Sequence, residues 1–461
     1  MLPVPLQNAA VSLVGQSFAR RRYGKKYQEY LSSLMRSQWF SYEQFRDLQT
    51  EQLRKLIKEA INNVPYYRAV LGGIANRVDS MTLDSMNEIP ILEKSVLRTR
   101  TREFINKERL KYGYSTTRTS GTSGSPLEMP CDTPSMKYNT AFRDRMFRWA
   151  GITGREVNVL LTARLILGKK NGPPFWRYNA AEHQWLFSLY HMTDKNLARY
   201  AEKIAAIKPV YISGLVSALY VLAMWIKDNG RTGEIRPWAV ITAGENVHDF
   251  QRKEIESAFG SRIFDYYSSS EGSPFITQCD AGRMHVNPES GIIEFIRPDA
   301  SAAQPGEDAE MVVTSFYQRA VPLIRYRIGD TAAIAQEQNC PCGRQMPLVE
   351  YVGGRESDTL YSTERGRIGS AAISTVFYKM SSRLKESQIE QTGTDSFVFR
   401  YVPLNESLSD KEKSIVVEEL KNRLGSSIDI GIRIVKEIPK GPNAKSRLIV
   451  GLNKSDNTDR L

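Results

Sequence analysis

The chain has 461 residues and a net charge of +12, from 63 lysines and arginines against 51 aspartates and glutamates. Its content of 41% hydrophobic and 25% charged residues is typical of a globular protein. The length allows one large and one smaller domain, or three modest ones. The only dense basic cluster is Arg20-Arg21-Arg22 with Lys25 and Lys26, and the signs are mixed elsewhere, which argues against a nucleic-acid-binding protein. Four cysteines in this length argue against a disulfide framework and favour a reducing, cytoplasmic compartment.

The N-terminal residues predict no signal peptide, because positive charges follow the mildly apolar residues 1–18 rather than precede them. Residues 4–26 are expected to form either a basic interfacial helix, in peripheral contact with the inner face of a membrane, or a helix packed on the large domain. The longest uncharged apolar run, residues 210–226, is shorter than the about 20 residues of a membrane span. A buried strand that turns into a helix is expected there.

The first long segment, residues 27–72, places apolar and aromatic side chains near helical spacing, and Asn63-Val-Pro65 ends this helical stretch. Ile89-Pro-Ile-Leu is expected to be a short loop before a helix that starts at Glu93-Lys-Ser-Val.

Hydroxyl and glycine residues are concentrated in the next segment, residues 115–126. Glycine lets backbone N–H groups approach a ligand closely and hydroxyls add donors, so this run predicts a phosphate-holding loop. It lacks the Gly-Lys-Ser/Thr ending of a Walker loop, and a flexible linker is the alternative for the run taken alone. The candidate phosphate-binding residues are Thr119, Ser120, Gly121, Thr122, Ser123 and Gly124.

Strands and helices alternate after this loop, which predicts an α/β fold with mostly parallel sheets, followed by a strand-rich subdomain from residue 291. The expected elements are strands at 157–162, 210–213, 238–242 and 263–267 and helices at 194–207, 218–227 and 249–259. Beyond Gly354 the pattern changes to a small α+β unit. We therefore expect a large N-terminal domain, residues 1–356, and a small, mobile C-terminal domain, residues 357–461.

Polar residues follow several of the predicted strands, at the edge of a parallel sheet where ligands bind. Each of these segments has an ordinary interpretation as a turn or a surface residue when it is taken alone. The segments are Thr242-Ala-Gly-Glu245, Asp265-Tyr-Tyr-Ser-Ser-Ser-Glu-Gly272, Arg325-Tyr-Arg-Ile-Gly-Asp330, Gly353-Gly-Arg-Glu-Ser-Asp358 and a glycine/proline loop with Lys445.

In this order the segments resemble the adenylate-forming ligase superfamily, in the phenylacetate–CoA ligase branch with the CapK-like proteins of polysaccharide gene clusters. The resemblance spans roughly residues 27–450 and is more specific than one glycine loop. The matching runs are Thr119–Pro126, Tyr267-Ser-Ser-Ser-Glu271, Arg325–Asp330, Gly354-Arg355 through Asp358, Asn63–Arg68 and Ile89–Lys94.

The resemblance implies an AMP-forming reaction, in which a carboxylic acid attacks ATP and the acyl group then passes to coenzyme A. It implies that the phosphate loop holds phosphates, Glu271 holds Mg²⁺, Asp330 accepts the ribose hydroxyls and Arg355 contacts ribose or phosphate. Lys445 is the implied catalytic lysine, and Ser357 or Asp358 the hinge. The implied adenine pocket and remaining nucleotide contacts are Gly244, Glu245, Tyr267 and Ser270.

Four positions depart from the family pattern and leave the level of activity open. Ser125 replaces a phosphate-loop lysine, Ser268 a glycine, Ser357 a hinge acid and Ala444 the glycine before the catalytic lysine. An amide- or ester-forming ligase, which passes the acyl group to an amine or sugar, is an alternative, and a catalytically silent, zinc-stabilised adenylate-binding scaffold is another. The expected acid-binding strands, around residues 157–162, 212–217 and 242–246, show no telling charge that names the acid.

Three of the four cysteines and one histidine fall between residues 279 and 342. Three thiolates and an imidazole satisfy tetrahedral Zn²⁺, and four protein ligands predict a closed, structural site. The Cys-x-Cys spacing is tighter than usual, and free or buried thiols are the alternative. The predicted zinc ligands are Cys279, His285, Cys340 and Cys342.

Overall fold

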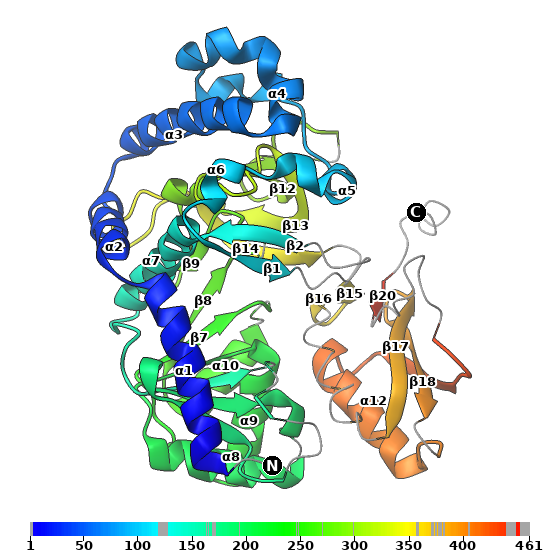
Figure 1. Cartoon of the computed structure of the whole chain (residues 1–461). Coiled ribbons are helices and arrows are strands. Elements are labelled where there is room, and N and C mark those ends of the chain that lie inside the picture. The colour runs from blue at the N-terminus through cyan, green and yellow to red at the C-terminus, as the bar shows by residue number, and fades with distance from the viewer. Residues whose placement is uncertain are drawn as a thin grey trace.

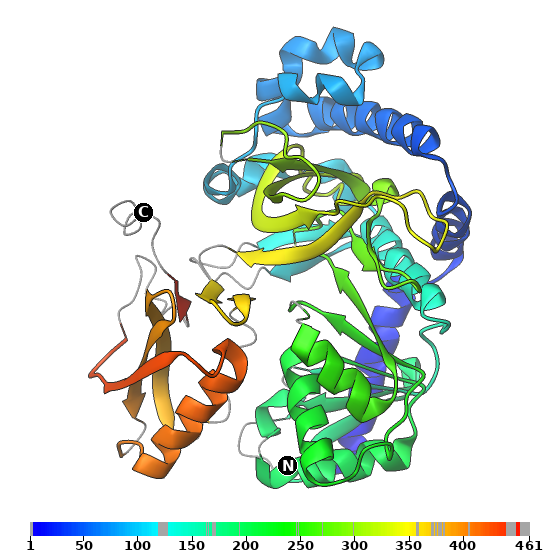
Figure 2. The same ribbon diagram turned by 180° about the vertical axis from the view of Figure 1, so that it is seen from behind.

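The computed structural model of the protein describes residues 3–118, 128–162, 164, 166–167, 172–192, 194–245, 247, 249–269, 271–297, 299–355, 359–369, 373, 376, 380, 383–403, 406–438 and 449–451. Its arrangement is shown from two sides in Figures 1 and 2. The helices are α1 Val4–Arg22, α2 Lys25–Ser37, α3 Tyr42–Asn63, α4 Pro65–Leu71, α5 Lys94–Thr99, α6 Lys107–Leu110, α7 Thr133–Trp149, α8 Asp194–Ile207, α9 Val216–Asp228, α10 Asp249–Phe259 and α12 Asp410–Leu424.

The helical stretch predicted at residues 27–72 is confirmed as α2, α3 and α4, with breaks between them. Ser41 begins α3 with a capping box, in which its hydroxyl accepts from the Gln44 backbone N–H and the Gln44 side chain accepts in return. Pro65 lacks a backbone N–H, so α3 ends at Asn63 and Pro65 occupies the first turn of α4.

The central sheet has twelve strands in the order β11-β12-β13-β14-β10-β9-β8-β7-β6-β3-β5-β4. Five neighbouring strands in it are parallel: β5 Gln184–Ser188, β3 Asn158–Thr162, β6 Tyr211–Gly214, β7 Ala239–Ala243 and β8 Arg262–Tyr267. Helix α7 packs on one face of these strands, whereas α8, α9 and α10 cover the other, because alternate strand residues point to opposite faces. The predicted α/β class is confirmed.

The remaining strands of this sheet pair antiparallel, and β11, β12, β13 and β14 among them form the strand-rich part expected from residue 291 onward. They are β4 Trp176–Asn179, β9 Ile276–Gln278, β10 Met284–Val286, β11 Gly291–Ile296, β12 Asp308–Ser315, β13 Tyr326–Ile334 and β14 Leu348–Arg355. A separate hairpin, β1 Tyr114–Arg118 and β2 Glu128–Asp132, flanks the predicted phosphate loop.

The C-terminal elements form their own sheet and their own core around α12 (Figure 1). The sheet has the order β19-β18-β17-β20, with bounds β17 Leu384–Gly393, β18 Ser396–Pro403, β19 Asp429–Ile434 and β20 Ile449–Val450. A two-stranded hairpin, β15 Thr359–Ser362 and β16 Gly366–Gly369, precedes it.

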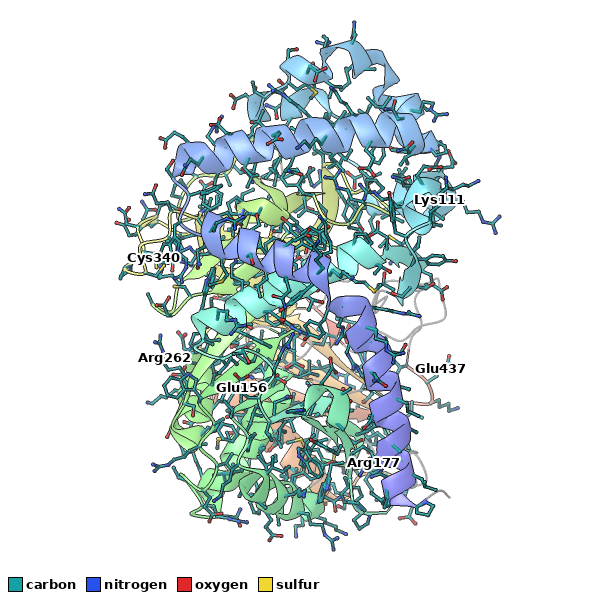
Figure 3. All side chains as sticks on the ribbon, turned by 60° about the vertical axis from the view of Figure 1, so that its left-hand side comes forward. Lys111, Glu156, Arg177, Arg262, Cys340 and Glu437 are labelled. Carbon is teal, nitrogen blue, oxygen red and sulfur yellow. The ribbon has the colours of Figure 1, made fainter. Side chains whose placement is uncertain are left out.

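Helix α1 packs along the strands at the edge of the sheet. Its Gly15 is buried, and a Cβ there would lie 2.2 Å from the side-chain oxygen of Asn179, so only glycine permits this approach. Arg177 on β4, labelled in Figure 3, donates to the Gln7 side chain at 2.8 Å. Within the described part of the chain, no helix is both long and apolar enough to cross a membrane.

Candidate active site and metal centre

The carboxyl ends of the parallel strands bring the predicted ligand-binding segments to one edge of the sheet. The strand register aligns Gly214 on β6 with Thr242 on β7, and Ala243 on β7 with Tyr266 on β8. Gly244 follows directly with a φ of +80°, a conformation that glycine adopts without strain. Strand β7 therefore ends at this edge in a tight turn that contains Gly244, a residue of the predicted adenine pocket.

Tyr267 and Asp330, predicted from two separate motifs, are in direct contact. The Tyr267 hydroxyl donates to Asp330 Oδ2 at 2.7 Å. Burial raises the pKa of Tyr267 well above its usual range, and the neighbouring Asp330 carboxylate adds to this effect. The phenol therefore stays protonated and fixes the orientation of the carboxylate.

Glu271 is buried four residues beyond Tyr267, with its side chain only 4% exposed. Its Oε1 lies 3.1 Å from Nζ of Lys94, at the start of α5. A buried carboxylate needs such a partner, because an unpaired charge is costly away from water. Lys94 belongs to a run that matched the family pattern, but no role for it was predicted from the sequence.

The segment before Lys94 is bound to β13 by backbone hydrogen bonds. Leu92 N–H donates to the Arg325 carbonyl at 2.8 Å, and Arg327 N–H donates to the Leu92 carbonyl at 3.0 Å. The Arg325 guanidinium donates to both carboxylate oxygens of Glu294, at 3.0 and 2.8 Å, and to the Ile89 carbonyl at 2.6 Å. The runs Ile89–Lys94 and Arg325–Asp330, far apart in the sequence, therefore form one unit. This unit places Lys94 beside Glu271 and Asp330 beside Tyr267.

Asp265 is a further carboxylate at this edge, and it was not predicted from the sequence as a site residue. Its Oδ1 accepts from the Thr242 hydroxyl at 2.8 Å. Burial raises the pKa of Asp265 to about 6. A charged residue inside an otherwise apolar strand run was the available signal. Gly244, Glu245, Tyr267, Glu271 and Asp330 are the described residues predicted to contact a nucleotide or its Mg²⁺, and we call them the nucleotide edge.

Some predicted site residues lie outside the described residues. They are Thr119, Ser120, Gly121, Thr122, Ser123, Gly124, Ser270, Ser357, Asp358 and Lys445. Arg355 is described as part of β14, where it is the register partner of Asp330 on β13.

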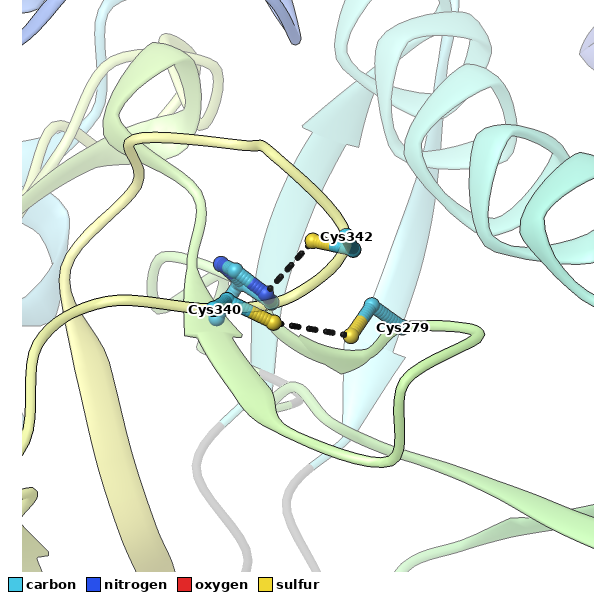
Figure 4. Close-up of side chains that lie close together, drawn as sticks. Cys279, Cys340 and Cys342 are labelled. Atoms are coloured by element: carbon cyan, nitrogen blue, oxygen red, sulfur yellow. Dashed lines mark hydrogen bonds between the residues drawn. The ribbon is translucent and has the colours of Figure 1, made fainter.

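The four predicted metal ligands come together from the β9–β10 hairpin and from the connection between β13 and β14 (Figure 4). Cys279 and His285 flank the turn between β9 and β10, and Cys340 and Cys342 lie between β13 and β14. Cys279 Sγ lies 3.6 Å from Cys340 Sγ, and Cys342 Sγ lies 3.4 Å from His285 Nε2. All four ligand atoms lie within 4.8 Å of one another.

These distances fit a tetrahedral zinc ion, whose sulfur and nitrogen ligands are about 3.3–3.8 Å apart. Burial lowers the pKa of His285 to about 4, so the imidazole is neutral and able to bind a metal. Burial acts to raise the pKa of Cys342, but hydrogen bonds from Arg344 outweigh it and lower the pKa of this thiol. Burial raises the pKa of Cys279 to about 12 and also raises that of Cys340. The chemistry of the donor set therefore fits a structural Zn²⁺.

Comparison with known proteins agrees with the motifs. Residues 360–451 match the family model of the CapK C-terminal domain. The chain is 26% identical to Protein CapK of Staphylococcus aureus over 97% of both chains. It is 23% identical to a phenylacetate-coenzyme A ligase of Thermus thermophilus, over 89% of this chain and 97% of that protein.

Among solved structures, the fold is similar to that of 2-hydroxyisobutyryl-CoA ligase in the postadenylation state. The TM-score is 0.58 at 16% identity, over 90% of this chain and 91% of the other. The predicted resemblance to adenylate-forming ligases of the CapK-like branch is confirmed by these similarities.

Proposed function

We propose that this relative of the CapK-like adenylate-forming ligases joins a carboxylic acid to AMP, releases pyrophosphate, and then passes the acyl group to coenzyme A. The observation that carries the proposal is the contact of Tyr267 with Asp330 beside the buried Glu271, at the carboxyl edge of parallel strands. The similarity to a phenylacetate-coenzyme A ligase supports the choice of coenzyme A. A place in capsule or polysaccharide biosynthesis rests on the similarity to CapK.

In this proposal ATP lies across the nucleotide edge. Asp330 accepts hydrogen bonds from the ribose hydroxyls, since the oxygens of one carboxylate suit a diol. Gly244, Glu245, Tyr267 and Ser270 line the adenine side, and Arg355, next to Asp330 in the sheet, contacts ribose or phosphate. The loop that carries Thr119–Gly124 holds the β- and γ-phosphates.

The acid then attacks the α-phosphate, so two anions must approach each other. Oriented donors and cations lower the barrier by stabilising the charge that develops in the transition state. Lys445 supplies a cation to the carboxylate and the α-phosphate. Mg²⁺, which favours a carboxylate and phosphate oxygens, would be held by Glu271 and neutralise phosphate charge.

In this proposal the two domains of the chain have different roles. We assign residues 1–356 to the large domain and residues 357–461 to a small domain that turns about Ser357 or Asp358 between the two half-reactions. The separate core of β17, β18, α12 and their neighbours, and the family match at 360–451, support this boundary.

The first experiment is ATP–pyrophosphate exchange across a panel of carboxylic acids with Mg²⁺, for wild type, Lys445→Ala and Lys436→Ala. Lys436 is exposed in the same region and serves as the matched control. We expect acid-dependent exchange that falls at least about a hundredfold only in Lys445→Ala. ATP binding without exchange for any acid would favour the silent scaffold.

The acceptor is tested with the acid that exchanges best. AMP release stimulated by coenzyme A, with an acyl thioester as product, supports a CoA ligase. Stimulation by amines or sugars instead would establish the amide- or ester-forming alternative.

We also propose that α1 touches a membrane surface peripherally. Leu6, Leu13, Val14 and Phe18 are 54%, 69%, 57% and 43% exposed, and basic residues follow them. Flotation with anionic liposomes should carry the wild-type chain upward, and Leu13→Glu with Val14→Glu should abolish this. Wild-type protein that stays at the bottom contradicts the proposal.

A further inference from the structure

A cavity of about 950 Å³ runs over the face of the parallel strands that α1 and α7 cover. Its floor includes Leu160 on β3, Ser213 on β6 and Ile241 on β7, which are register neighbours on that face of the sheet. Ligand pockets commonly measure roughly 300–1,000 Å³, so this cavity holds an acid considerably larger than a single ring.

The wall of this cavity is strongly basic. A single carboxylate, Glu182, lines it among the described residues. Five arginines line it from four parts of the chain: Arg20 and Arg22 on α1, Arg143 on α7, Arg155 before β3 and Arg164 after β3. We call this space the arginine cavity.

Two carboxylates neutralise part of this charge. Glu182 Oε1 accepts from Arg22 Nη1 at 2.9 Å. Asp144 accepts from Arg143 Nε at 3.0 Å and from Arg143 Nη2 at 2.9 Å. The ion pairs among the described residues therefore account for two of the five guanidinium groups.

The excess positive charge affects the pKa of an arginine that lines the cavity. Burial lowers the pKa of Arg22, and the like charges of Arg143 and Arg164 lower it further, against the opposing effect of Glu182. Arg155 lies 5.1 Å from the ring centre of Tyr23 and is thereby held over the cavity wall. An anionic ligand relieves this repulsion.

The arginine cavity is separate from the nucleotide edge but adjoins it. Tyr267, Glu271 and Asp330 are not among the described residues that line it. Tyr266 does line it, and consecutive residues of a strand point to opposite faces. The cavity thus begins beside the proposed adenylate position, at Thr242, and extends away from it beneath α1.

We propose that the arginine cavity binds the part of the acid substrate beyond the reacting carboxylate, and that this part carries a further anionic group, either a carboxylate or a phosphate. Arginine forks bind both groups through paired N–H donors. The proposal rests on the proposed function, because it assigns the substrate class of the same enzyme.

The test compares acids that differ by one anionic group: adipate against hexanoate, 4-carboxyphenylacetate against phenylacetate, and 2-phosphoglycolate against glycolate. In ATP–pyrophosphate exchange we expect kcat/KM to be about tenfold or more higher for a member with the further anionic group, equivalent to about 1.4 kcal/mol. A preference for adipate or 4-carboxyphenylacetate identifies a carboxylate as the further group, and a preference for 2-phosphoglycolate identifies a phosphate. Equal or reversed preference in all pairs overturns the proposal.

Arg20→Gln and Arg21→Gln form a matched pair, because both residues are exposed on α1 but only Arg20 is among the residues that line the cavity. Arg20→Gln and Arg155→Gln should raise KM for the preferred dianionic acid about three- to tenfold, leave KM for ATP unchanged, and make it less sensitive to salt. Arg21→Gln should resemble wild type. Equal effects of Arg20→Gln and Arg21→Gln, or an increase in KM for ATP or coenzyme A instead, contradict the proposal.

Equilibrium titration of the same acids without ATP separates this inference from the proposed function. Tighter binding of adipate or 2-phosphoglycolate than of its partner, weakened by Arg155→Gln, supports the arginine cavity even if no acid supports exchange. Absence of any such difference overturns the cavity proposal, whereas loss of exchange alone overturns only the enzymatic one.

Discussion

The nucleotide edge and the arginine cavity adjoin at the carboxyl ends of the same strands, yet they are built in opposite ways. The edge comes from short runs in which neighbouring residues serve one site, such as Tyr267 and Glu271. The cavity is assembled from single arginines on α1, α7 and two connections. The site proposed to bind the nucleotide is thus recognisable from local motifs, whereas the site proposed to bind the variable part of the acid depends on packing.

Among substitutions in the nucleotide edge, Glu271→Gln should lower the rate of ATP–pyrophosphate exchange most strongly. The amide keeps the size but removes the negative charge that faces Lys94 and is proposed to hold Mg²⁺. We expect exchange to fall by about a factor of 10²–10³, with binding of the dianionic probe acids unchanged. Glu93→Gln, on an exposed carboxylate beside Arg327, is the control. A variant with near-normal exchange contradicts the assignment.

Zinc removal should destabilise the nucleotide edge more than the arginine cavity, because the ligands join the β9–β10 turn to the connection between β13 and β14. We expect about one zinc per chain by elemental analysis, and a Tm lowered by about 5–10 °C in Cys340→Ser. Cys131→Ser, on β2 and not a member of the cluster, is the control. A wild-type chain that contains no zinc, or whose Tm is unchanged when the metal is removed, would rule out a structural zinc.

Tyr267→Phe removes the hydroxyl that orients Asp330, without changing the ring. Hydrogen bonds to charged groups contribute about 1.5–3 kcal/mol, so we expect KM for ATP to rise by roughly tenfold while KM for the acid stays constant. Tyr266→Phe should raise KM for the acid and leave KM for ATP constant, since Tyr266 lines the arginine cavity. Steady-state kinetics with each substrate varied in turn would show whether adjacent tyrosines serve separate sites.

Lys94→Ala should have a smaller and more specific effect. Without the ammonium at 3.1 Å, Glu271 loses a competitor for Mg²⁺ and also a group that orients it. We expect the Mg²⁺ concentration for half-maximal exchange to fall about two- to threefold and kcat to fall about tenfold. A changed kcat with an unchanged Mg²⁺ dependence would show that Lys94 acts only on the substrates.

The local elements were largely predictable from the sequence. Helices at 194–207 and 249–259 and the strands before Gly244 and Ser268 are confirmed, because helical and strand periodicities and flanking turn residues are short-range signals. The contact between Tyr267 and Asp330 was not predictable from the sequence, and neither was the pairing of Lys94 with Glu271. These contacts depend on the β13 register and on the bridge between Leu92 and Tyr326.

The sequence by itself determined the fold class, the resemblance to adenylate-forming ligases and the identity of the four metal-ligand candidates, because each depends on residue types at fixed local spacing. Only the tertiary structure brought the metal-ligand atoms within 4.8 Å of one another and placed Lys94 on Glu271. The strands expected to bind the acid show no telling charge of their own. The arginines above them come from α1, α7 and neighbouring connections, so the charge of the cavity is decided by long-range packing, which no local pattern records.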